Sequence, residues 1–312
     1  MRIIFMGTPE FAVASLAALL AAGEDIVAVV TVPDKPAGRG RKLQQSAVKQ
    51  YALSKRIPVL QPEKLRDADF LAQLRAFRAD LQVVVAFRML PEVVWNMPAQ
   101  GTVNLHASLL PQYRGAAPIN HAVINGETES GVTTFLLQHE IDTGHILFTE
   151  AVGIGPNDTA GDLHDRLMTV GAQLLVKTVH AIANGTAEPV PQQNLATAGA
   201  LKHAPKIFKE DCLIEWHEPV ASVHNLIRGL SPYPGAHTEL DGHTLKIFKA
   251  APEKAAVAHP PGTYLTDGVS LLKVACIDGY IHIEELQLAG KKRMDTADFL
   301  RGYRPSSVTI VS

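Results

Sequence analysis

The chain has 312 residues, of which 46% are hydrophobic and 19% are charged, so it can bury a large core, and its length suggests two domains. Its 29 basic and 31 acidic side chains give a net charge of -2, which excludes a strong overall field for polyanions and leaves only a local patch for nucleic-acid binding. The two cysteines, Cys212 and Cys276, form no CxxC pair, which argues against a disulfide framework or a zinc site.

The chain carries no recognisable targeting or membrane segment. Residues 1–7 hold too short an apolar run for a signal peptide, and no stretch reaches the roughly 18 apolar residues of a membrane helix. We therefore expect a bacterial cytoplasmic protein with reduced cysteines, no membrane association and no obligate protein partner.

The first half of the chain alternates short apolar strands with helices. Residues 3–6 are typical of a buried strand, with Thr8 as the N-cap of the following helix and Pro9 at its first position. Further strands are predicted at 26–32, 58–60, 81–86 and 102–105, and helices at 48–55 and 67–77. This alternation indicates an α/β fold with a Rossmann-like, mostly parallel sheet.

The second half changes character after a long helix. Two more strands (132–137 and 146–152) and a helix over 159–183 complete a predicted catalytic domain at 1–185, and the proline-containing stretch 186–206 is typical of a linker. Beyond it, short strand-like runs at 245–248, 269–274 and 280–286 are separated by three Asp-Gly turns. These turns predict a smaller antiparallel sheet or barrel over 207–312.

A polar pair lies at the end of the predicted strand 102–105. Asn104 and His106 alternate along the chain, so both side chains emerge on one face of the sheet, at the strand end where ligands bind in open α/β sheets. An amide donor beside an imidazole suits a carbonyl oxygen that becomes negative. Asp142, in a later turn, could keep His106 protonated or order a water for proton transfer.

Plainer interpretations of these residues stay open on the residues alone. A lone histidine at a strand end is more often structural than catalytic, Asn104 could cap a turn, and Asp142 before Thr-Gly is a common turn composition. His139 and His145 flank Asp142, but their separation across a glycine turn is not a recognised ligand spacing, so no metal site is expected.

A basic, Pro/Gly-rich segment lies between residues 34 and 49. Asp34 is its only acidic residue, against five basic ones: Lys35, Arg39, Arg41, Lys42 and Lys49. Such an excess suits a mobile loop that grips a phosphate backbone, although a solvated surface loop has the same composition. The segment 207–312 holds a second cluster at 291–293 but has 11 basic and 13 acidic residues in all.

Several motifs together resemble one enzyme family. The segment 104–115, NLHASLLPQYRG, and the turn Asp142-Thr143-Gly144 resemble those of the folate-dependent formyltransferases. The segments 5–12, 33–42, 203–207, 231–236 and 289–294 narrow the resemblance to the members that act on the charged initiator methionyl-tRNA. The resemblance covers essentially the whole chain and implies an OB-like β-barrel as the C-terminal domain.

The resemblance also implies roles for individual residues. Asn104, His106 and Asp142 match the family's catalytic trio, and 10-formyltetrahydrofolate is the implied co-substrate, without a metal. The implied folate-contacting residues form two turns: Ser108, Leu109, Leu110 and Pro111, together with Phe87, Arg88, Met89 and Leu90. The implied tRNA-contacting residues are Arg39, Arg41, Lys42, Lys206, Lys291 and Lys292. The chain departs from the family pattern at Phe87-Arg88 and at His145, where the family usually has an acidic residue.

Three other functions compete with this one. A formyltransferase for a small amine, such as glycinamide ribonucleotide, would share the trio but would not need residues 207–312. A nucleotide-dependent oxidoreductase is disfavoured because Gly7-Thr8-Pro9 lacks the G-x-G-x-x-G fingerprint. A pure RNA-binding module would leave the trio without a purpose.

Overall fold

A computed structural model describes residues 1–37, 42–140, 142–195, 199–306 and 308–310. Contacts divide the chain into two compact units. The first unit comprises Met1–Gly115, Ser130–Val152 and His164–His203, and the second comprises Ala116–Glu129, Gly153–Leu163 and Ala204–Ser312. Because these units interleave along the chain, the domain boundaries expected at residues 185 and 207 stay a prediction.

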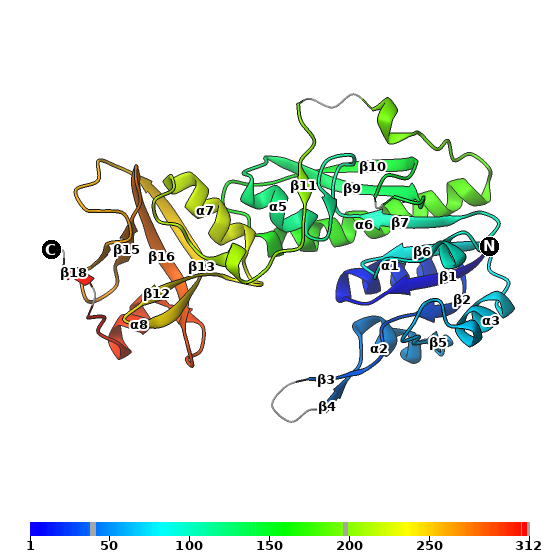
Figure 1. Ribbon diagram of the computed structural model, residues 1–312, viewed down its shortest axis with the longest axis horizontal. Coiled ribbons are helices and arrows are strands. Elements are labelled where there is room, and N and C mark those ends of the chain that lie inside the picture. Colours follow the sequence, from blue (N-terminus) through cyan, green and yellow to red (C-terminus); the bar gives the residue numbers. More distant parts are fainter. Residues whose placement is uncertain (38–41, 141, 196–198, 307, 311–312) are drawn as a thin grey trace. The chain divides into compact units, whose positions relative to one another are not determined.

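A seven-stranded sheet forms the centre of the first unit within the described ranges (Figure 1). Its strands, from one edge to the other, are β10 (Ile146–Gly153), β9 (Glu129–Leu136), β7 (Thr102–His106), β6 (Leu81–Val85), β1 (Arg2–Gly7), β2 (Asp25–Val30) and β5 (Val59–Leu60). The five strands from β7 to β5 are parallel, and β9 runs antiparallel to β7. This arrangement confirms the predicted Rossmann-like class.

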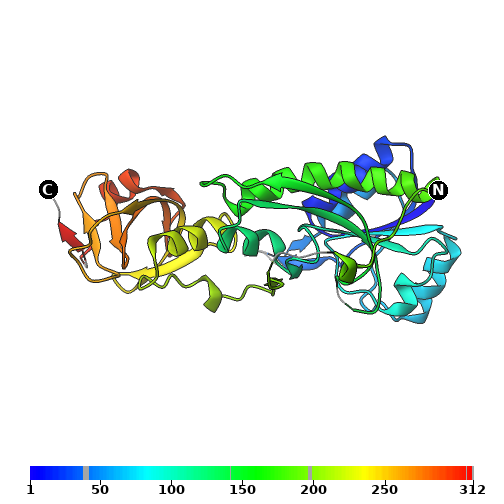
Figure 2. The same cartoon turned by 90° about the horizontal axis from the view of Figure 1, so that it is seen from above.

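Helices cover both faces of this sheet, as Figure 2 shows for the long helix α6 (Ala160–Ala183) and for α3 (Ala68–Ala76) on opposite sides. The side chains of β1 alternate between the faces, which lets one strand serve both layers. Ile4 and Met6 pack in one apolar cluster with Phe70 and Leu74 of α3, while Ile3 and Phe5 are fully buried on the other side. The remaining helices of this unit are α1 (Glu10–Ala21), α2 (Ala47–Ser54) and α4 (Glu92–Trp95).

The N-terminal ends of these helices correct one prediction and confirm two helices. The expectation that Thr8 caps the first helix is wrong, because α1 begins at Glu10 with Pro9 as its N-cap and no side-chain capping bond. By contrast, Ser46 Oγ and Asp67 Oδ1 each accept a backbone N–H in the first turn of α2 and α3, at 3.0 Å. The helices predicted at 48–55 and 67–77 therefore begin at well-formed caps.

The basic segment 34–49 is more ordered in its described parts than the loop we predicted. β3 (Lys35–Ala37) and β4 (Lys42–Gln44) pair antiparallel as a hairpin. At its base, Asp34 Oδ2 lies 2.6 Å from Lys49 Nζ, and Asp34 Oδ1 accepts from Gln61 Nε2 at 2.8 Å. Hydrogen bonds from Lys49 and then Gln61 lower the pKa of Asp34 below its ordinary value.

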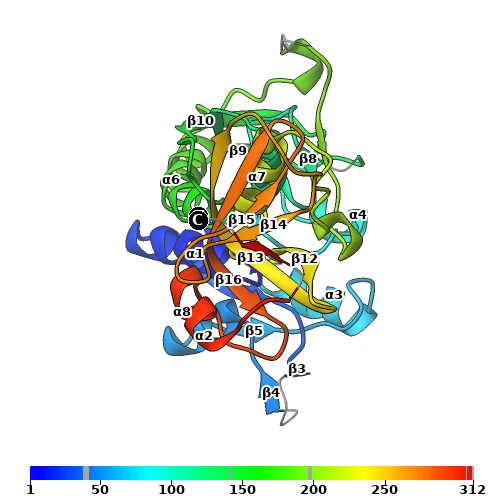
Figure 3. The ribbon, with the colours of Figure 1, turned by 90° about the vertical axis from the view of Figure 1, so that its left-hand side faces the viewer.

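The second unit is built around a curled, mostly antiparallel sheet, most of whose strands are labelled in Figure 3. Its strand order is β12 (Ala236–Leu240), β13 (His243–Lys254), β16 (Gly279–Leu288), β15 (Leu272–Ala275), β14 (Tyr264–Thr266) and β18 (Val308–Ile310), with β17 (Met294–Asp295) beside β16. The pairing of β13 with β16 shifts register on both sides of Lys249, and such bulges bend a sheet. The result is the half-barrel expected from the OB-like prediction.

Turn chemistry explains where these strands begin and end. Asp241 and Gly242 have φ of 49° and 75°, the left-handed pair that a tight hairpin requires, and they join β12 to β13 as predicted. The strand predicted to begin at Val269 begins at Leu272 instead. The Asp267 carboxylate accepts three backbone N–H groups, those of Val269, Ser270 and Leu271, which lowers its pKa to about 2 and closes a turn there.

Several short elements were not predicted. They include α5 (Pro118–Ile124), α7 (Val220–Gly229) and α8 (Thr296–Gly302), the two-residue strands β8 (Arg114–Gly115) and β11 (His203–Ala204), and 3-10 turns at Gln192–Asn194 and Glu210–Cys212. In the described part of the chain, no helix combines the length and apolarity needed to cross a membrane.

The core of the first unit can be tested by one matched pair of substitutions. We expect Leu16→Ala in α1, where Leu16 is fully buried, to lower the free energy of unfolding by about 2–5 kcal/mol because it leaves a cavity. Leu53→Ala in α2 is the control, since Leu53 is 52% exposed and its loss should cost about 0.5 kcal/mol or less. Equal losses in urea denaturation would contradict this packing.

Candidate functional site

The carboxyl end of β7 presents Asn104 and His106 to one face of the sheet. Asn104 pairs with Val84 of β6, and Val84 belongs to the apolar cluster that includes Leu90, so Asn104 points to the side of the sheet covered by the 87–90 turn. Asn104 is half-buried, and its amide makes no hydrogen bond to another described residue. A donor in this state is free to bind a ligand.

His106 is nearly buried, with 7% of its surface exposed, and its ring has one fixed partner. Its Nε2 lies 2.9 Å from the carbonyl oxygen of Tyr113. Because a carbonyl only accepts, Nε2 must carry a hydrogen, and Nδ1 is left as the ring nitrogen that can exchange a proton. The Tyr113 carbonyl is itself held, since the Tyr113 N–H donates to Lys202 O at 2.7 Å.

Asp142 brings a carboxylate to this nitrogen. Its Oδ2 lies 3.9 Å from His106 Nδ1 and accepts the Gly115 N–H at 3.0 Å. Both side chains are largely buried, at 7% and 12% exposed, so little water screens the pair. The distance exceeds a hydrogen bond, and the contact is therefore electrostatic in the ligand-free site.

The Asp142 turn has an unusual backbone. Asp142 has a φ of 54°, in the left-handed region that few non-glycine residues adopt. Two residues later, a Cβ added at Gly144 would lie 1.7 Å from the Leu136 carbonyl oxygen, so the turn closes only with glycine there. The predicted trio is thus assembled by the end of β7 and by this strained turn between β9 and β10.

The turn 108–111 is held mainly by buried hydrogen bonds. Ser108 is fully buried, and its hydroxyl donates to Gln112 O at 2.7 Å. Thr133 Oγ1 donates to Ser108 O at 2.7 Å and accepts from Leu110 N at 3.1 Å. Leu110 packs against Phe135 and Ile146. These side chains shape the turn, and sequence reasoning missed Thr133 because no local pattern links it to residue 108.

The other turn expected to contact folate, 87–90, mixes buried and exposed side chains. Phe87 and Leu90 pack in the apolar cluster beside β6, and Met89 is 75% exposed. Arg88 donates from Nη1 to Glu63 O at 2.9 Å and from Nη2 to Pro62 O, which ties this turn to the segment after β5. Burial lowers the pKa of Arg88 from its ordinary value. Its departure from the family pattern therefore has a structural role.

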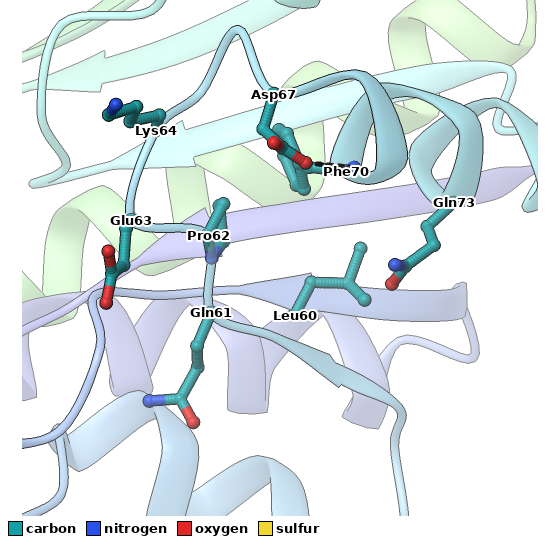
Figure 4. A pocket seen from close by; sticks show the side chains of 8 residues that line it. All are labelled: Leu60, Gln61, Pro62, Glu63, Lys64, Asp67, Phe70 and Gln73. Atoms are coloured by element: carbon teal, nitrogen blue, oxygen red, sulfur yellow. Dashed lines mark hydrogen bonds between the residues drawn. The ribbon is translucent and has the colours of Figure 1, made fainter.

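The hollows on the first unit include two of particular interest for the site. One, of about 410 Å³, is lined by the segment between β5 and α3 and by residues of α3. Figure 4 shows its polar side chains, which include Gln61, Glu63, Lys64 and Asp67. None of the trio lines it. A second of about 560 Å³ lies against the Asp142 turn and is lined by Pro111, Arg114, Glu140, Thr143, His145 and Gln192.

Gln192, in the segment 186–206 that was predicted to be a linker, forms hydrogen bonds with the Asp142 turn. Gln192 is 4% exposed, and its Nε2 donates to Asp142 O at 2.7 Å and to Gly144 O at 2.9 Å. Its Oε1 accepts from Nε and Nη2 of Arg114, at 3.1 and 2.5 Å. Nothing in the composition of residues 186–206 predicted this contact.

The basic residues expected to contact tRNA are only partly described. Arg39 and Arg41 lie outside the described residues, and Lys42 is described only through its backbone in β4. In the second unit, Lys206 is exposed with Nζ 5.2 Å from the Phe208 ring centroid, and Lys291 and Lys292 are exposed with no ion pair to any described residue. Their neighbour Arg293 is occupied by Glu285 and by the Phe248 ring.

The two histidines that flank Asp142 have ordinary partners. His139 Nε2 lies 3.6 Å from Glu92 Oε1, with its ring edge-on to Trp95, and His145 Nε2 lies 3.2 Å from Gln138 Nε2. Among the residues that the structure describes, no group of three or more His, Cys, Asp or Glu side chains converges on one point.

Comparison with known proteins gives a family for this geometry. Residues 1–179 match the formyl transferase family, and residues 206–304 match the formyl transferase C-terminal domain. The methionyl-tRNA formyltransferase of Bacteroides thetaiotaomicron is 56% identical over 313 residues, covering 98% of this chain and 97% of the relative. That of Porphyromonas gingivalis is 48% identical over 314 residues, with the same coverage.

Solved structures share the fold at low sequence identity. WlaRD, a sugar 3N-formyl transferase in the presence of dTDP and 5-N-formyl-THF, has a TM-score of 0.65 at 22% identity, covering 94% of this chain and 99% of that one. HypX from Aquifex aeolicus, in complex with tetrahydrofolic acid, has a TM-score of 0.66 at 18% identity, covering 100% of this chain and 49% of that one.

The close contact at Gly144 yields a test of the site's backbone. We expect Gly144→Ala to destabilise the protein by about 1–3 kcal/mol, because the new methyl group overlaps the Leu136 carbonyl and the turn must open. Gly153→Ala, also in this part of the chain, is the matched control, because its Cβ would meet nothing within 4 Å. Thermal unfolding of both variants checks this, and an unchanged midpoint for Gly144→Ala would contradict the turn geometry.

Proposed function

The chain belongs to the formyl transferase family, within its group of methionyl-tRNA formyltransferases, and on that premise we propose that Asn104, His106 and Asp142 catalyse its reaction. The reaction moves the formyl group of 10-formyltetrahydrofolate to the α-amine of the charged initiator methionyl-tRNA, giving N-formylmethionyl-tRNA and tetrahydrofolate. The observation that supports the proposal most is the approach of the buried Asp142 carboxylate to the one exchangeable nitrogen of His106.

The reaction does not need a strong base, but it needs a site that binds and aligns both substrates. The amine nitrogen attacks the formyl carbon, the formyl oxygen becomes negative, and the bond from that carbon to the folate nitrogen then breaks. The proton that the amine loses ends on the folate nitrogen, which makes it a tolerable leaving group. A free α-amine titrates near 7.7–8.0 in model peptides, and the ester lowers this further, so much of the amine is neutral at pH 7. The needs are alignment of two substrates and stabilisation of the oxyanion.

The trio matches those needs group by group. The Asn104 amide is a neutral donor with no hydrogen-bond partner among the residues that the structure describes, which suits the developing oxyanion. His106 has Nε2 committed to Tyr113, so Nδ1 is the nitrogen that takes up a proton, and in the protonated ring its N–H is the donor for the same oxygen or for proton transfer. Asp142 supplies the negative charge that balances an imidazolium and can pass a proton through a bound water.

The proposed site for the folate carrier lies beside this trio. We propose that it binds where the 87–90 turn meets the 108–111 turn, because Asn104 faces the cluster that contains Phe87 and Leu90. Phe87 and Leu90 offer an apolar wall, and backbone groups of both turns offer polar contacts for a flat heterocycle. The buried hydrogen bonds of Ser108 and Thr133 keep the second turn rigid.

The tRNA requires positive charge that the chain as a whole lacks. We propose that Arg39 and Arg41, which follow β3 in the sequence, and Lys42, the first residue of β4, contact the phosphates of the acceptor end. Lys206, Lys291 and Lys292 are proposed as further contacts. The exposure of these three lysines, together with the lack of an ion pair for Lys291 or Lys292 within the described residues, supports that role.

The trio is tested by single alanine substitutions. We expect Asn104→Ala, His106→Ala and Asp142→Ala each to lower kcat by about 100-fold to 10,000-fold, the scale for a lost oxyanion donor or acid–base group. The measurement is single-turnover formylation of charged initiator tRNA. His180→Ala on α6 is the matched histidine control, because its side chain is 51% exposed and far along the chain from the trio's motifs. Near-normal turnover of a folded His106→Ala protein would rule out this mechanism.

The basic segment is tested by the salt dependence of tRNA use. Removing one phosphate contact should flatten the dependence of log KM for tRNA on log salt by about one unit, because one fewer counterion is released. We expect this for Arg39→Ala, with KM for folate unchanged. Arg75→Ala is the matched control, since Arg75 is exposed near the end of α3, outside the basic segment. Identical slopes for the parent and Arg39→Ala would mean that the segment is a solvated surface element.

A further inference from the structure

Gln192 is a buried amide whose hydrogen-bonding capacity is completely used. Nε2 carries two hydrogens and has two acceptors, the carbonyls of Asp142 and Gly144. Oε1 has two lone pairs and receives two donors from Arg114. A side chain that is 4% exposed and fully paired is fixed in one orientation, because each lost bond would leave a buried polar group unsatisfied.

The two carbonyls that Gln192 binds belong to the part of the Asp142 turn whose backbone is strained. Asp142 adopts a left-handed backbone, a conformation that costs free energy for a non-glycine residue and persists only where surrounding contacts impose it. The Gln192 amide bridges the carbonyl of Asp142 and the carbonyl two residues later, and so fixes both sides of the turn.

Arg114 links the hydrogen bonds of Gln192 to the carboxylate of Asp142. Its guanidinium orients the Gln192 amide, since a charged donor can bond Oε1 but not Nε2. The next residue, Gly115, donates its N–H to Asp142 Oδ2 at 3.0 Å. Consecutive residues of one short strand therefore fix the carboxylate of Asp142 directly and its backbone through Gln192.

The segment that carries Gln192 is anchored independently. Val190 and Ile146 exchange backbone hydrogen bonds in both directions, each of 2.8 Å, at the start of β10. Gln192 then begins a 3-10 turn that directs its side chain inward. Part of the stretch 186–206 is thus attached to the site by its backbone and by a side chain.

We propose that Gln192 is a positioning residue for formyl transfer, which acts by holding the Asp142 carboxylate at its place beside His106 Nδ1. The inference rests on the proposed function, because it acts only if Asp142 contributes to turnover. At 3.9 Å the pair is sensitive to small shifts of the turn, and a misplacement of about 1 Å can cost about 100-fold in rate. Loss of Gln192 should therefore lower kcat and leave the substrate KM values nearly unchanged.

Two variants separate donation by the amide from packing. Gln192→Met keeps the length of the side chain and removes every hydrogen bond, and we expect kcat to fall by about 10-fold to 100-fold. Gln192→Glu keeps the acceptor for Arg114 but sets a carboxylate against the carbonyls of Asp142 and Gly144, and kcat should fall at least as far. Gln193→Met is the matched control, since Gln193 is the exposed neighbour in the same 3-10 turn and should keep its full kcat.

A double-mutant cycle with Asp142 supplies a readout that a purely structural role would not give. In the Asp142→Ala background, Gln192→Met should lower kcat by less than about twofold, because the group that it positions is gone. An equal fold loss in both backgrounds would overturn the proposal. So would full turnover of a folded Gln192→Glu protein, a rise in KM that accounts for the whole loss, or failure of both Gln192 variants to fold.

The same data distinguish failure of this inference from failure of the proposed function. Normal turnover of Asp142→Ala alone would overturn both. A slow Asp142→Ala protein combined with a fully active Gln192→Met protein would overturn only the positioning role and leave the catalytic trio in place.

Discussion

The approach of the Asp142 carboxylate to His106 Nδ1 is the interaction on which the site depends. It exists because β9 runs antiparallel to β7 with Thr133 opposite His106, so that the turn after β9 returns to the end of β7. The turn closes only because Gly144 has no side chain and because Asp142 accepts a left-handed backbone. The geometry that we propose to be catalytic thus results from strand order and one tight turn, and the described residues contain no cluster of metal ligands.

Around this contact, the hydrogen bonds divide the polar groups into fixed and free ones. Tyr113 O, Gly115 N–H and the Gln192 amide fix the ring, the carboxylate and the turn. The Asn104 amide has no partner among the described residues, and Nδ1 of His106 faces the carboxylate beyond hydrogen-bond distance. The free groups are those that a developing oxyanion requires, and because the fixed groups are preorganised, little reorganisation is needed when charge develops.

Local patterns were sufficient to predict the sheet of the first unit and the position of Asn104 and His106. Strand-like runs of four to seven residues predicted β1, β2, β6 and β7, and strand alternation placed the two polar side chains on one face. Asp142 was predicted as a site residue from the composition of its turn and from the resemblance of its motif to the family's. The resemblance implied the OB-like barrel, and the Asp-Gly turns predicted a small antiparallel sheet or barrel; the turn at Asp241-Gly242 forms the hairpin that joins β12 and β13.

The rest could not be read from the sequence for a physical reason. Gln192 contacts Asp142 across 50 positions, Arg114 across 78, and Thr133 contacts Ser108 across 25, so no periodicity or turn rule links these pairs. The residue type of Thr8 predicts a helix N-cap, yet Pro9 is the N-cap of α1. The basic residues Arg39 and Arg41 remain predictions from composition and resemblance, as do the domain boundaries.

The most direct test of the account is the identity of the acceptor. The purified chain is given 10-formyltetrahydrofolate with a labelled formyl carbon, together with charged initiator methionyl-tRNA and a small amine such as glycinamide ribonucleotide at equal concentration. The account predicts that the label appears in the acid-precipitable tRNA fraction and is released as N-formylmethionine when the ester is hydrolysed. Label found only in the small amine, with the tRNA unmodified, would contradict it.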